Sequence, residues 1–285
     1  MTGMLDAPFE IRNDEDLPIR CDLRTPSGPG PFPVVVVVHG FKGFKDWGMF
    51  PPTARFLAEQ GVATVAMNTS KNGIGEKLDE FTELELFATN TPAREVADVR
   101  RVVDAIAAGE LGGELDASRV GLLGHSRGGG VIVLHAAADA RVECLVTWGS
   151  IATFHRHTQR AIESWREEGR LEIPNLRTGQ ILWHDVAVLD DLERRRADYD
   201  IETAARGVTV PFLAIHGAQD EAVDSGDSER LITWAGSAEK RLHILESTGH
   251  TFGCMHPWAG PTPAWTVAVE ETAAWFRAWL GAGRV

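Results

Sequence analysis

The chain has few cysteines, and they follow no pattern typical of a cross-linked or metal-binding protein. Its 285 residues include three, Cys21, Cys144 and Cys254. An odd and sparse set predicts no disulfide framework. Without a Cys-x-x-Cys pair, a zinc site built on thiolates is not expected either. Cys144 lies in an apolar run, where a small buried hydrophobic side chain is the simplest interpretation.

Long hydrophobic runs and an excess of positive charge are also missing. No stretch approaches the roughly 20 apolar residues that span a bilayer, and the first residues lack the basic and apolar regions of a secretory signal. We therefore expect a soluble, cytoplasmic protein without a membrane partner. The formal net charge is −13. A field of this sign repels phosphate backbones, so nucleic acid is not an expected partner.

What the sequence does contain is a regular alternation of strands and helices. Five consecutive valines, residues 34–38, do not alternate with polar residues, which predicts a strand buried on both faces. Later apolar strands alternate with amphipathic segments, such as a helix beginning at Pro92 with Thr91 as its cap. The pattern predicts an α/β fold, a mostly parallel sheet with helices on both faces. Residues 9–26 read as two strands joined by a short turn, so we expect them to form an antiparallel edge.

One block, residues 151–208, interrupts this alternation. It is rich in charge and predicts two helical stretches, 155–170 and 190–207, with a possible hairpin at 171–184 between them. A connection of this length between two sheet strands is usually a functional insertion. We therefore expect a cap or lid at 151–208, inserted into a core domain formed by residues 1–150 and 209–285. A surface excursion without a role is the alternative.

A lone serine lies where an apolar strand is expected to give way to a helix. The sequence Gly-His-Ser-Arg-Gly, residues 124–128, places glycines two residues before and after Ser126. Small neighbours permit the sharp strand-to-helix turn, known as a nucleophile elbow, that lifts a serine hydroxyl clear of the sheet. The same turn points the first N–H groups of the helix toward the hydroxyl, where they favour negative charge. The alternative is a glycine-rich helix start that only packs closely on the strand.

A serine nucleophile needs a base, and the base needs an acid to orient it. His250 follows a predicted strand and is the candidate base. Asp220 follows another strand and is the candidate acid, with Glu221 and Asp224 as rivals. Because the ends of parallel strands meet at one edge of the sheet, Ser126, Asp220 and His250 can converge there. The other histidines considered for the base are His216, His243 and His256.

An acyl-transfer site also needs donors for a developing oxyanion. The glycine-containing turn after the valine strand offers the backbone N–H of Phe41, with Gly40 as a fallback. The N–H of Arg127, directly after the serine, is the second candidate donor. The guanidinium of Arg127 is free to bind a carboxylate of the cap or of a substrate, and the sequence does not decide between them.

These motifs together resemble the α/β-hydrolase superfamily. The chain looks most like its dienelactone-hydrolase-like and acyl-esterase branch, which includes cinnamoyl and feruloyl esterases. The similarity rests on residues 39–43, 124–129, 216–223 and 249–253, covers nearly the whole chain and is weakest in the cap. It implies an α/β-hydrolase fold and a serine esterase that forms an acyl-enzyme, with no metal or cofactor. Ser126 stands where dienelactone hydrolases carry a cysteine, so dienelactone is not the expected substrate.

Three tryptophans are candidates for a substrate pocket. Trp47 follows the oxyanion turn, Trp148 ends a central strand and Trp183 lies in the cap, and each is placed to line an acyl or aryl pocket. Helical spacing in the last helix instead indicates core packing for Trp265, Trp275 and Trp279. The cap histidines lack metal-ligand spacing, so no metal site is expected at His155, His157 and His184.

The expected partner is a small-molecule ester. A peptidase, an amidase or a thioesterase on the same fold remains open, because the motifs for these activities look alike. A ligand-binding homologue without catalysis is a more remote alternative, since such proteins tend to lose a member of the triad. The charged cap helices also leave open an interaction role, such as a homodimer.

Overall fold

The structure is a computed structural model that describes residues 5–112 and 114–281. A sheet of eight strands crosses the molecule in the order β1-β2-β4-β3-β5-β6-β9-β10. Its strands are β1 Leu5–Arg12, β2 Pro18–Thr25, β3 Phe32–Val38, β4 Ala63–Met67, β5 Leu115–His125, β6 Val142–Trp148, β9 Phe212–Gly217 and β10 Lys240–Leu245. The pairs β1–β2 and β2–β4 are antiparallel and the other pairs are parallel. The predicted parallel sheet with an antiparallel N-terminal edge is confirmed.

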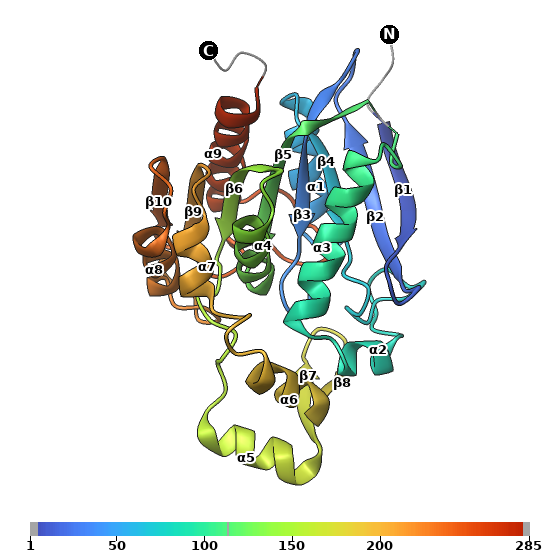
Figure 1. Ribbon diagram of the computed structural model, residues 1–285, viewed down its shortest axis with the longest axis vertical. Coiled ribbons are helices and arrows are strands. Elements are labelled where there is room, and N and C mark those ends of the chain that lie inside the picture. Colours follow the sequence, from blue (N-terminus) through green and yellow to red (C-terminus); the bar gives the residue numbers. More distant parts are fainter. Residues whose placement is uncertain (1–4, 113, 282–285) are drawn as a thin grey trace.

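Helices cover both faces of this sheet (Figure 1). One face packs against α1 Phe50–Glu59 and α9 Pro263–Leu280. The opposite face packs against α3 Pro92–Ala107, α4 Arg127–Ala138, α7 Ile201–Gly207 and α8 Gly226–Trp234. A short helix that the sequence did not reveal, α2 Leu84–Ala88, lies between β4 and α3. Within the described part of the chain, every helix is too short or too polar to cross a bilayer.

The valine strand shows why helices must pack on both faces of the sheet. Val34, Val36 and Val38 belong to the hydrophobic cluster on the α3–α4 face, whereas Val35 and Val37 belong to the cluster on the α1–α9 face. All five are at most 2% exposed. Because successive strand residues point to opposite faces, an unbroken apolar run is what a strand between two helical layers requires.

The segment between β6 and β9 holds a helix, a hairpin and two further helices. Its elements are α5 Gln159–Glu168, β7 Arg170–Asn175, β8 Gln180–Asp185, α6 Val186–Arg194 and α7. The predicted hairpin is confirmed, with β7 and β8 antiparallel. The helical stretch expected at 190–207 is instead broken in two, because the Asp200 side chain accepts from the N–H of Thr203 and begins a new helix there.

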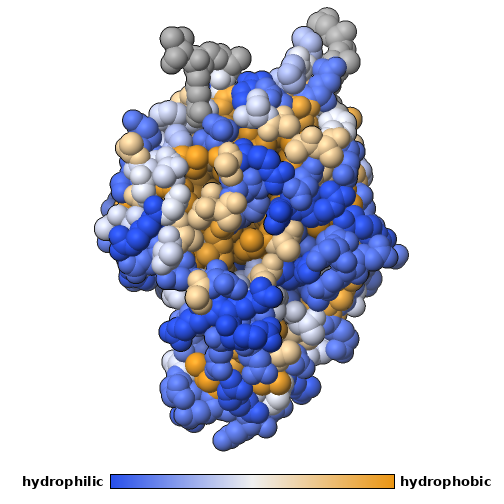
Figure 2. All heavy atoms as spheres, viewed as in Figure 1, coloured by the Kyte–Doolittle hydropathy of each residue, from blue (hydrophilic) through white to orange (hydrophobic). Residues whose placement is uncertain are grey.

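Most of this segment lies beyond one end of the sheet, at the bottom of Figure 1, while α7 returns to pack on α4 and α8. Its outward surface is mainly hydrophilic, whereas hydrophobic atoms show over the middle of the main body (Figure 2).

Candidate active site

Ser126 lies at a sharp bend between β5 and α4. Its backbone has φ 56° and ψ −122°, a conformation that a residue with a side chain adopts only when its surroundings enforce it. A Cβ on Gly124 would lie 2.5 Å from the carbonyl oxygen of Gly128, and one on Gly128 would lie 2.4 Å from that of His39. The two glycines that flank the serine are therefore required by close backbone packing, and the bend takes the form that the sequence indicated.

His250 and Asp220 meet at the same edge of the sheet. The Nδ1 atom of His250 lies 2.7 Å from Oδ2 of Asp220. A carboxylate only accepts hydrogen bonds, so Nδ1 carries the proton and Nε2 is left as the basic atom. The Asp220 side chain is 1% exposed, against 22% for His250. The imidazole of His250 is thus held by a buried carboxylate.

Asp220 is held in turn by its own loop. Oδ1 accepts the backbone N–H groups of Ala222 and Val223, both at 2.9 Å, and Oδ2 lies 3.1 Å from Nε2 of His216. Burial alone would raise the pKa of Asp220, but hydrogen bonds from His216 and His250 outweigh it and hold the pKa well below its usual range. His216, at the end of β9, thus belongs to the site as a support of the acid. From the sequence, His216 was considered as an alternative base.

Ser126 and His250 line one cavity of about 470 Å³, which we call the His250 cavity. The hydrogen bonds of the described residues do not include one between the Ser126 hydroxyl and Nε2 of His250. In free enzymes such bonds are often long and shorten when substrate binds. The two side chains therefore line the same cavity without a hydrogen bond between them.

His125 positions the loop that carries the base. Its Nε2 lies 3.0 Å from the backbone oxygen of His250, and the two imidazole rings are 4.6 Å apart between centroids. Burial, followed by the nearby His250, lowers the pKa of His125 to about 3. A neutral ring donates through one nitrogen only, so the Nε2–H of His125 donates to the His250 carbonyl.

The turn after β3 faces the serine. A Cβ on Gly40 would lie 2.7 Å from Cβ of Ser126, so only glycine lets the turn approach this closely. Phe41 follows directly, and Arg127 is the first residue of α4. The first N–H groups of a helix have no intrahelical acceptor and carry partial positive charge. The structure thus places the turn that carries Phe41 against Ser126 and begins α4 with Arg127, while the role of their N–H groups as oxyanion donors stays a prediction.

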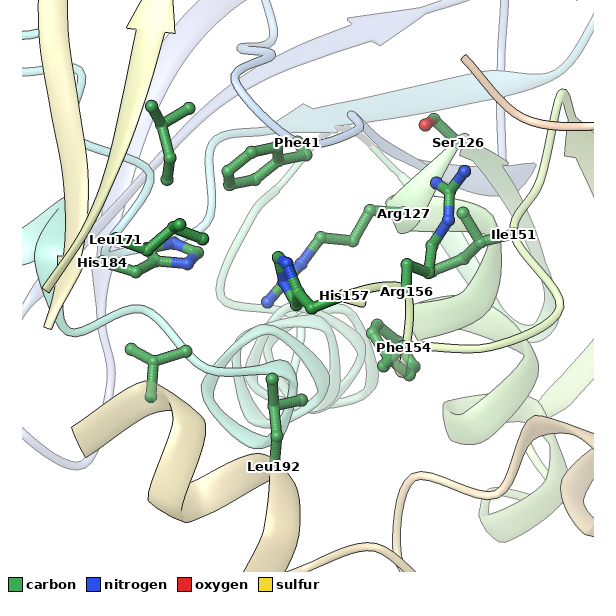
Figure 3. Close-up of a pocket in the computed structure, with 12 residues that line it drawn as sticks. Phe41, Ser126, Arg127, Ile151, Phe154, Arg156, His157, Leu171, His184 and Leu192 are labelled. Atoms are coloured by element: carbon green, nitrogen blue, oxygen red, sulfur yellow. The ribbon is translucent and has the colours of Figure 1, made fainter. Parts of the chain in front are cut away.

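A second cavity, of about 180 Å³, opens on the other side of Ser126, and we call it the Arg127 cavity. Its apolar lining includes Phe41 from the turn after β3, and Ile151, Phe154, Leu171, Val188 and Leu192 from the segment between β6 and β9. Figure 3 shows the Arg127 side chain extending between Phe41 and Phe154, whose ring centroids lie 5.8 and 5.6 Å from the guanidinium carbon. This cavity was not visible in any sequence motif, because its walls come from distant segments.

The Arg127 guanidinium is paired with an acid of α3 and not with one from residues 151–208. Its Nε donates to Glu95 of α3 at 2.7 Å, and both side chains are largely buried. The second oxygen of Glu95 accepts from Asn90 at 2.9 Å. The Nη2 atom of Arg127 is buried and has no hydrogen-bond partner within the described structure.

The three candidate pocket tryptophans lie in different places. Trp47 lines the His250 cavity and stacks on His256. Trp148 is fully buried on the α9 side, where its indole N–H donates to Thr272, so its side chain offers no surface to a substrate. Trp183 is half-buried on β8 and is absent from the lining of both cavities. The functional interpretation of Trp148 and Trp183 does not fit these positions.

The rival residues have other partners. Asp224 accepts from the N–H of Gly226 near the start of α8, and Glu221 is exposed. His243, on the outer strand β10, is paired with Glu271 of α9. Nδ1 of His256 accepts from the N–H of Gly48. Across residues 5–112 and 114–281, no group of three His, Cys, Asp or Glu side chains is placed to hold a metal ion.

Comparison with known proteins gives the fold its family. A model of the alpha/beta hydrolase family matches residues 35–269, and the chain belongs to this family. It is 24% identical to 2,6-dihydropseudooxynicotine hydrolase of Paenarthrobacter nicotinovorans, over 73% of the chain and 49% of that protein. An uncharacterized 31.7 kDa protein of Escherichia coli is 32% identical over 45% of the chain and 41% of its own length. The chain thus spans less than half the length of these curated relatives.

Solved structures share the fold over nearly the whole chain. The esterase domain of a Rhodothermus marinus protein has a TM-score of 0.66 and 21% identity, and covers 98% of this chain and 100% of its own. Est1E of Butyrivibrio proteoclasticus, with ferulic acid bound, has a TM-score of 0.68 and 20% identity, with 95% and 98% covered. These findings confirm the α/β-hydrolase resemblance. The chain has the α/β-hydrolase fold, and esterases are among its structural neighbours.

Proposed function

We propose that this protein is a serine hydrolase that cleaves carboxylic esters through an acyl-enzyme. The observation that carries the proposal is the convergence at one cavity of Ser126, on its strained bend, and His250, which is bonded to the buried Asp220. A bent serine beside a base whose tautomer is fixed by an acid is the arrangement that activates a hydroxyl for attack.

The proposed reaction has two steps. Nε2 of His250 takes the Ser126 proton while Oγ forms a bond to the ester carbonyl carbon. The carbonyl oxygen becomes an oxyanion between the N–H groups of Phe41 and Arg127. As the carbonyl re-forms, the bond to the leaving oxygen breaks, and His250 gives its proton to the departing alcohol. Water then repeats the sequence, releasing the acid and the free serine.

The two cavities divide the substrate between them in this proposal. His250 protonates the leaving oxygen, so the alcohol lies in the His250 cavity, which His250 lines. The acyl group then extends into the Arg127 cavity, whose lining includes Ser126 but not His250. Residues 151–208 act as a cap in this proposal, because Phe154, Leu171, Val188 and Leu192 build much of the wall of the acyl cavity.

A fluorophosphonate probe tests the nucleophile. The expected result is one covalent adduct per chain on the peptide that contains Ser126, formed as fluoride leaves phosphorus, and no adduct in Ser126→Ala. Thr147→Ala, a change beneath the site, is the matched control that keeps the label. Labelling of Ser126→Ala, or none of the native chain, contradicts the proposal.

A substrate panel tests the bond that is cleaved. p-Nitrophenyl acetate and butyrate should be hydrolysed with a burst of p-nitrophenol that reports acyl-enzyme formation. Aminoacyl anilides should react far more slowly, because an amide nitrogen needs stronger protonation to leave. Faster release from the anilides than from the esters would replace the esterase proposal with a peptidase or amidase.

A further inference from the structure

The Arg127 cavity combines an apolar wall with cationic groups, and no acid is among the described residues that line it. Two arginines, Arg127 and Arg156, and two histidines, His157 and His184, interrupt the apolar side chains. Figure 3 shows the side chains of Arg127 and Arg156 among the residues that line the cavity. Nε of Arg127 donates a hydrogen bond to Glu95. Glu95 is not among the described residues that line the cavity.

The charge of this lining comes from the arginines. Burial, followed by the charge of Arg127, lowers the pKa of His184 to about 3, so this imidazole is neutral at ordinary pH. Burial and the nearby arginines also lower the pKa of His157. Since Glu95 offsets one of the two arginines, Arg156 leaves the cavity with a net positive charge. Arg156 is exposed, and its guanidinium donates to the backbone oxygen of Ala222 at 2.6 Å.

Arg127 also has unused hydrogen-bonding capacity. Its side chain is 15% exposed, and Nη2 is buried without an acceptor among the residues that the structure describes. Leaving a buried charged donor unpaired is costly, so an acceptor supplied by a ligand would be favoured here.

We propose that the Arg127 cavity selects an acyl group ending in a carboxylate, so that the substrates are half-esters of short dicarboxylic acids. This rests on the proposed function, which places the acyl group in this cavity. A cavity of roughly 150 Å³ admits a molecule the size of benzene, and this one measures about 180 Å³. The apolar wall then holds a methylene chain, and the guanidinium of Arg127 binds the carboxylate at its end.

A matched pair of esters tests this proposal. The mono-p-nitrophenyl ester of adipic acid carries the carboxylate, and the same molecule with that carboxylate methylated does not. Both release p-nitrophenol, and the uncatalysed rate of each is subtracted. The native protein should favour the charged ester in kcat/KM by about tenfold or more, the worth of one hydrogen bond to a charged group. The ratio does not depend on the fraction of active enzyme, so partial misfolding of a variant does not change it.

Three variants locate the effect. Glu95→Gln/Arg127→Gln removes the buried pair together, so that neither charge is left alone, and should cause the largest fall in the ratio. Arg156→Gln should lower it in part. Arg160→Gln, which removes an exposed charge of α5 outside the lining, should leave it unchanged.

The outcomes separate this inference from the proposed function. Hydrolysis of both esters by the native protein with a ratio near one overturns the carboxylate site and leaves the esterase standing. A ratio that survives in Glu95→Gln/Arg127→Gln, or that falls only in Arg156→Gln, overturns the assignment to Arg127. Hydrolysis of neither ester by a protein that hydrolyses p-nitrophenyl acetate overturns this inference alone, whereas failure with p-nitrophenyl acetate as well overturns the esterase proposal.

Discussion

The two sides of Ser126 are held in place by different forces. On the His250 side, hydrogen bonds fix the groups near the base: Asp220 holds His250, His216 and two backbone amides hold Asp220, and His125 holds the carbonyl of His250. On the Arg127 side, apolar side chains from the core and from the segment between β6 and β9 form a wall around one buried ion pair.

In the proposed function, this difference separates the groups that catalyse the reaction from the groups that select the substrate. A hydrogen-bonded network requires particular atoms at particular distances, so changes there should affect every substrate alike. An apolar wall requires only volume and shape, so changes there should affect substrates according to the acyl group they carry. The predictions below test this division, beginning with the side that should respond most strongly.

The largest expected effect is on the acid. Asp220→Asn replaces an acceptor with a group that can donate to Nδ1 of His250, and this favours the wrong tautomer. We expect kcat to fall about 10⁴-fold, as in a comparable triad, for acetyl and hexanoyl esters alike. Steady-state kinetics on both p-nitrophenyl esters measure it. Asp224→Asn, a change four residues away outside both cavities, is the control. A loss confined to one ester would break the division.

Gly40→Ala should have the next largest effect. The added Cβ would lie 2.7 Å from Cβ of Ser126 and 3.1 Å from the backbone oxygen of His125, so the bend and the β3 turn must move apart. A displacement of about 1 Å at a catalytic group costs on the order of 10²-fold in rate, and we expect that loss in kcat for all esters. Gly207→Ala, whose Cβ meets only Ala137 at 3.7 Å, should retain native kinetics. Native activity in Gly40→Ala would show that the turn does not contribute to catalysis.

The same division explains what the sequence revealed. The residues of the His250 side lie directly after strands, in short motifs where glycine spacing and chain order are informative, and the structure places Ser126, Asp220 and His250 together. The alternation of strands and helices likewise predicted the sheet and its antiparallel edge, because both depend on local hydrophobic periodicity.

The residues of the Arg127 side form almost no recognisable local motif in the sequence. Its wall joins Phe41 to Leu192, which are adjacent only after folding, and the carboxylate that binds Arg127 comes from Glu95 on α3. Trp148 shows a second limit of prediction from the sequence. Its position at the end of β6 was correct, but the face to which its side chain points depends on packing against α9. A sequence motif predicts the position of a residue within a strand or helix better than it predicts what the side chain contacts.

Acid stability tests how strongly the Arg127 side depends on burial. The pKa of His184 is lowered to about 3 by burial first, below the usual 6.5 of an unfolded chain. The unfolded state therefore binds the proton first, and stability present above pH 6.5 is lost as the pH falls toward 3. His184→Phe keeps the ring beside Phe41 and Phe87 and removes the proton.

Urea unfolding at a series of pH values measures this effect. Between pH 6 and pH 4, the free energy of unfolding of His184→Phe should decline less than that of the native chain, by about 2 kcal/mol. The buried His125 and His135, with pKa values lowered to about 3 and about 4, keep part of the decline in both proteins. Parallel curves would mean that the pKa of His184 in the folded protein is close to that in the unfolded chain.

The smallest effect should be the most selective one. Leu171 lines the Arg127 cavity from β7, and Leu171→Trp fills part of the space proposed for the acyl chain. The ratio of kcat/KM for p-nitrophenyl hexanoate to that for the acetate should fall about tenfold, the scale on which an apolar pocket discriminates by size. Ile181→Trp places the same ring at an exposed position of the same hairpin, 51% accessible, and should keep the native ratio. An equal loss for both esters in Leu171→Trp would mean that this wall supports the catalytic groups themselves, and the two sides of Ser126 would then form a single unit.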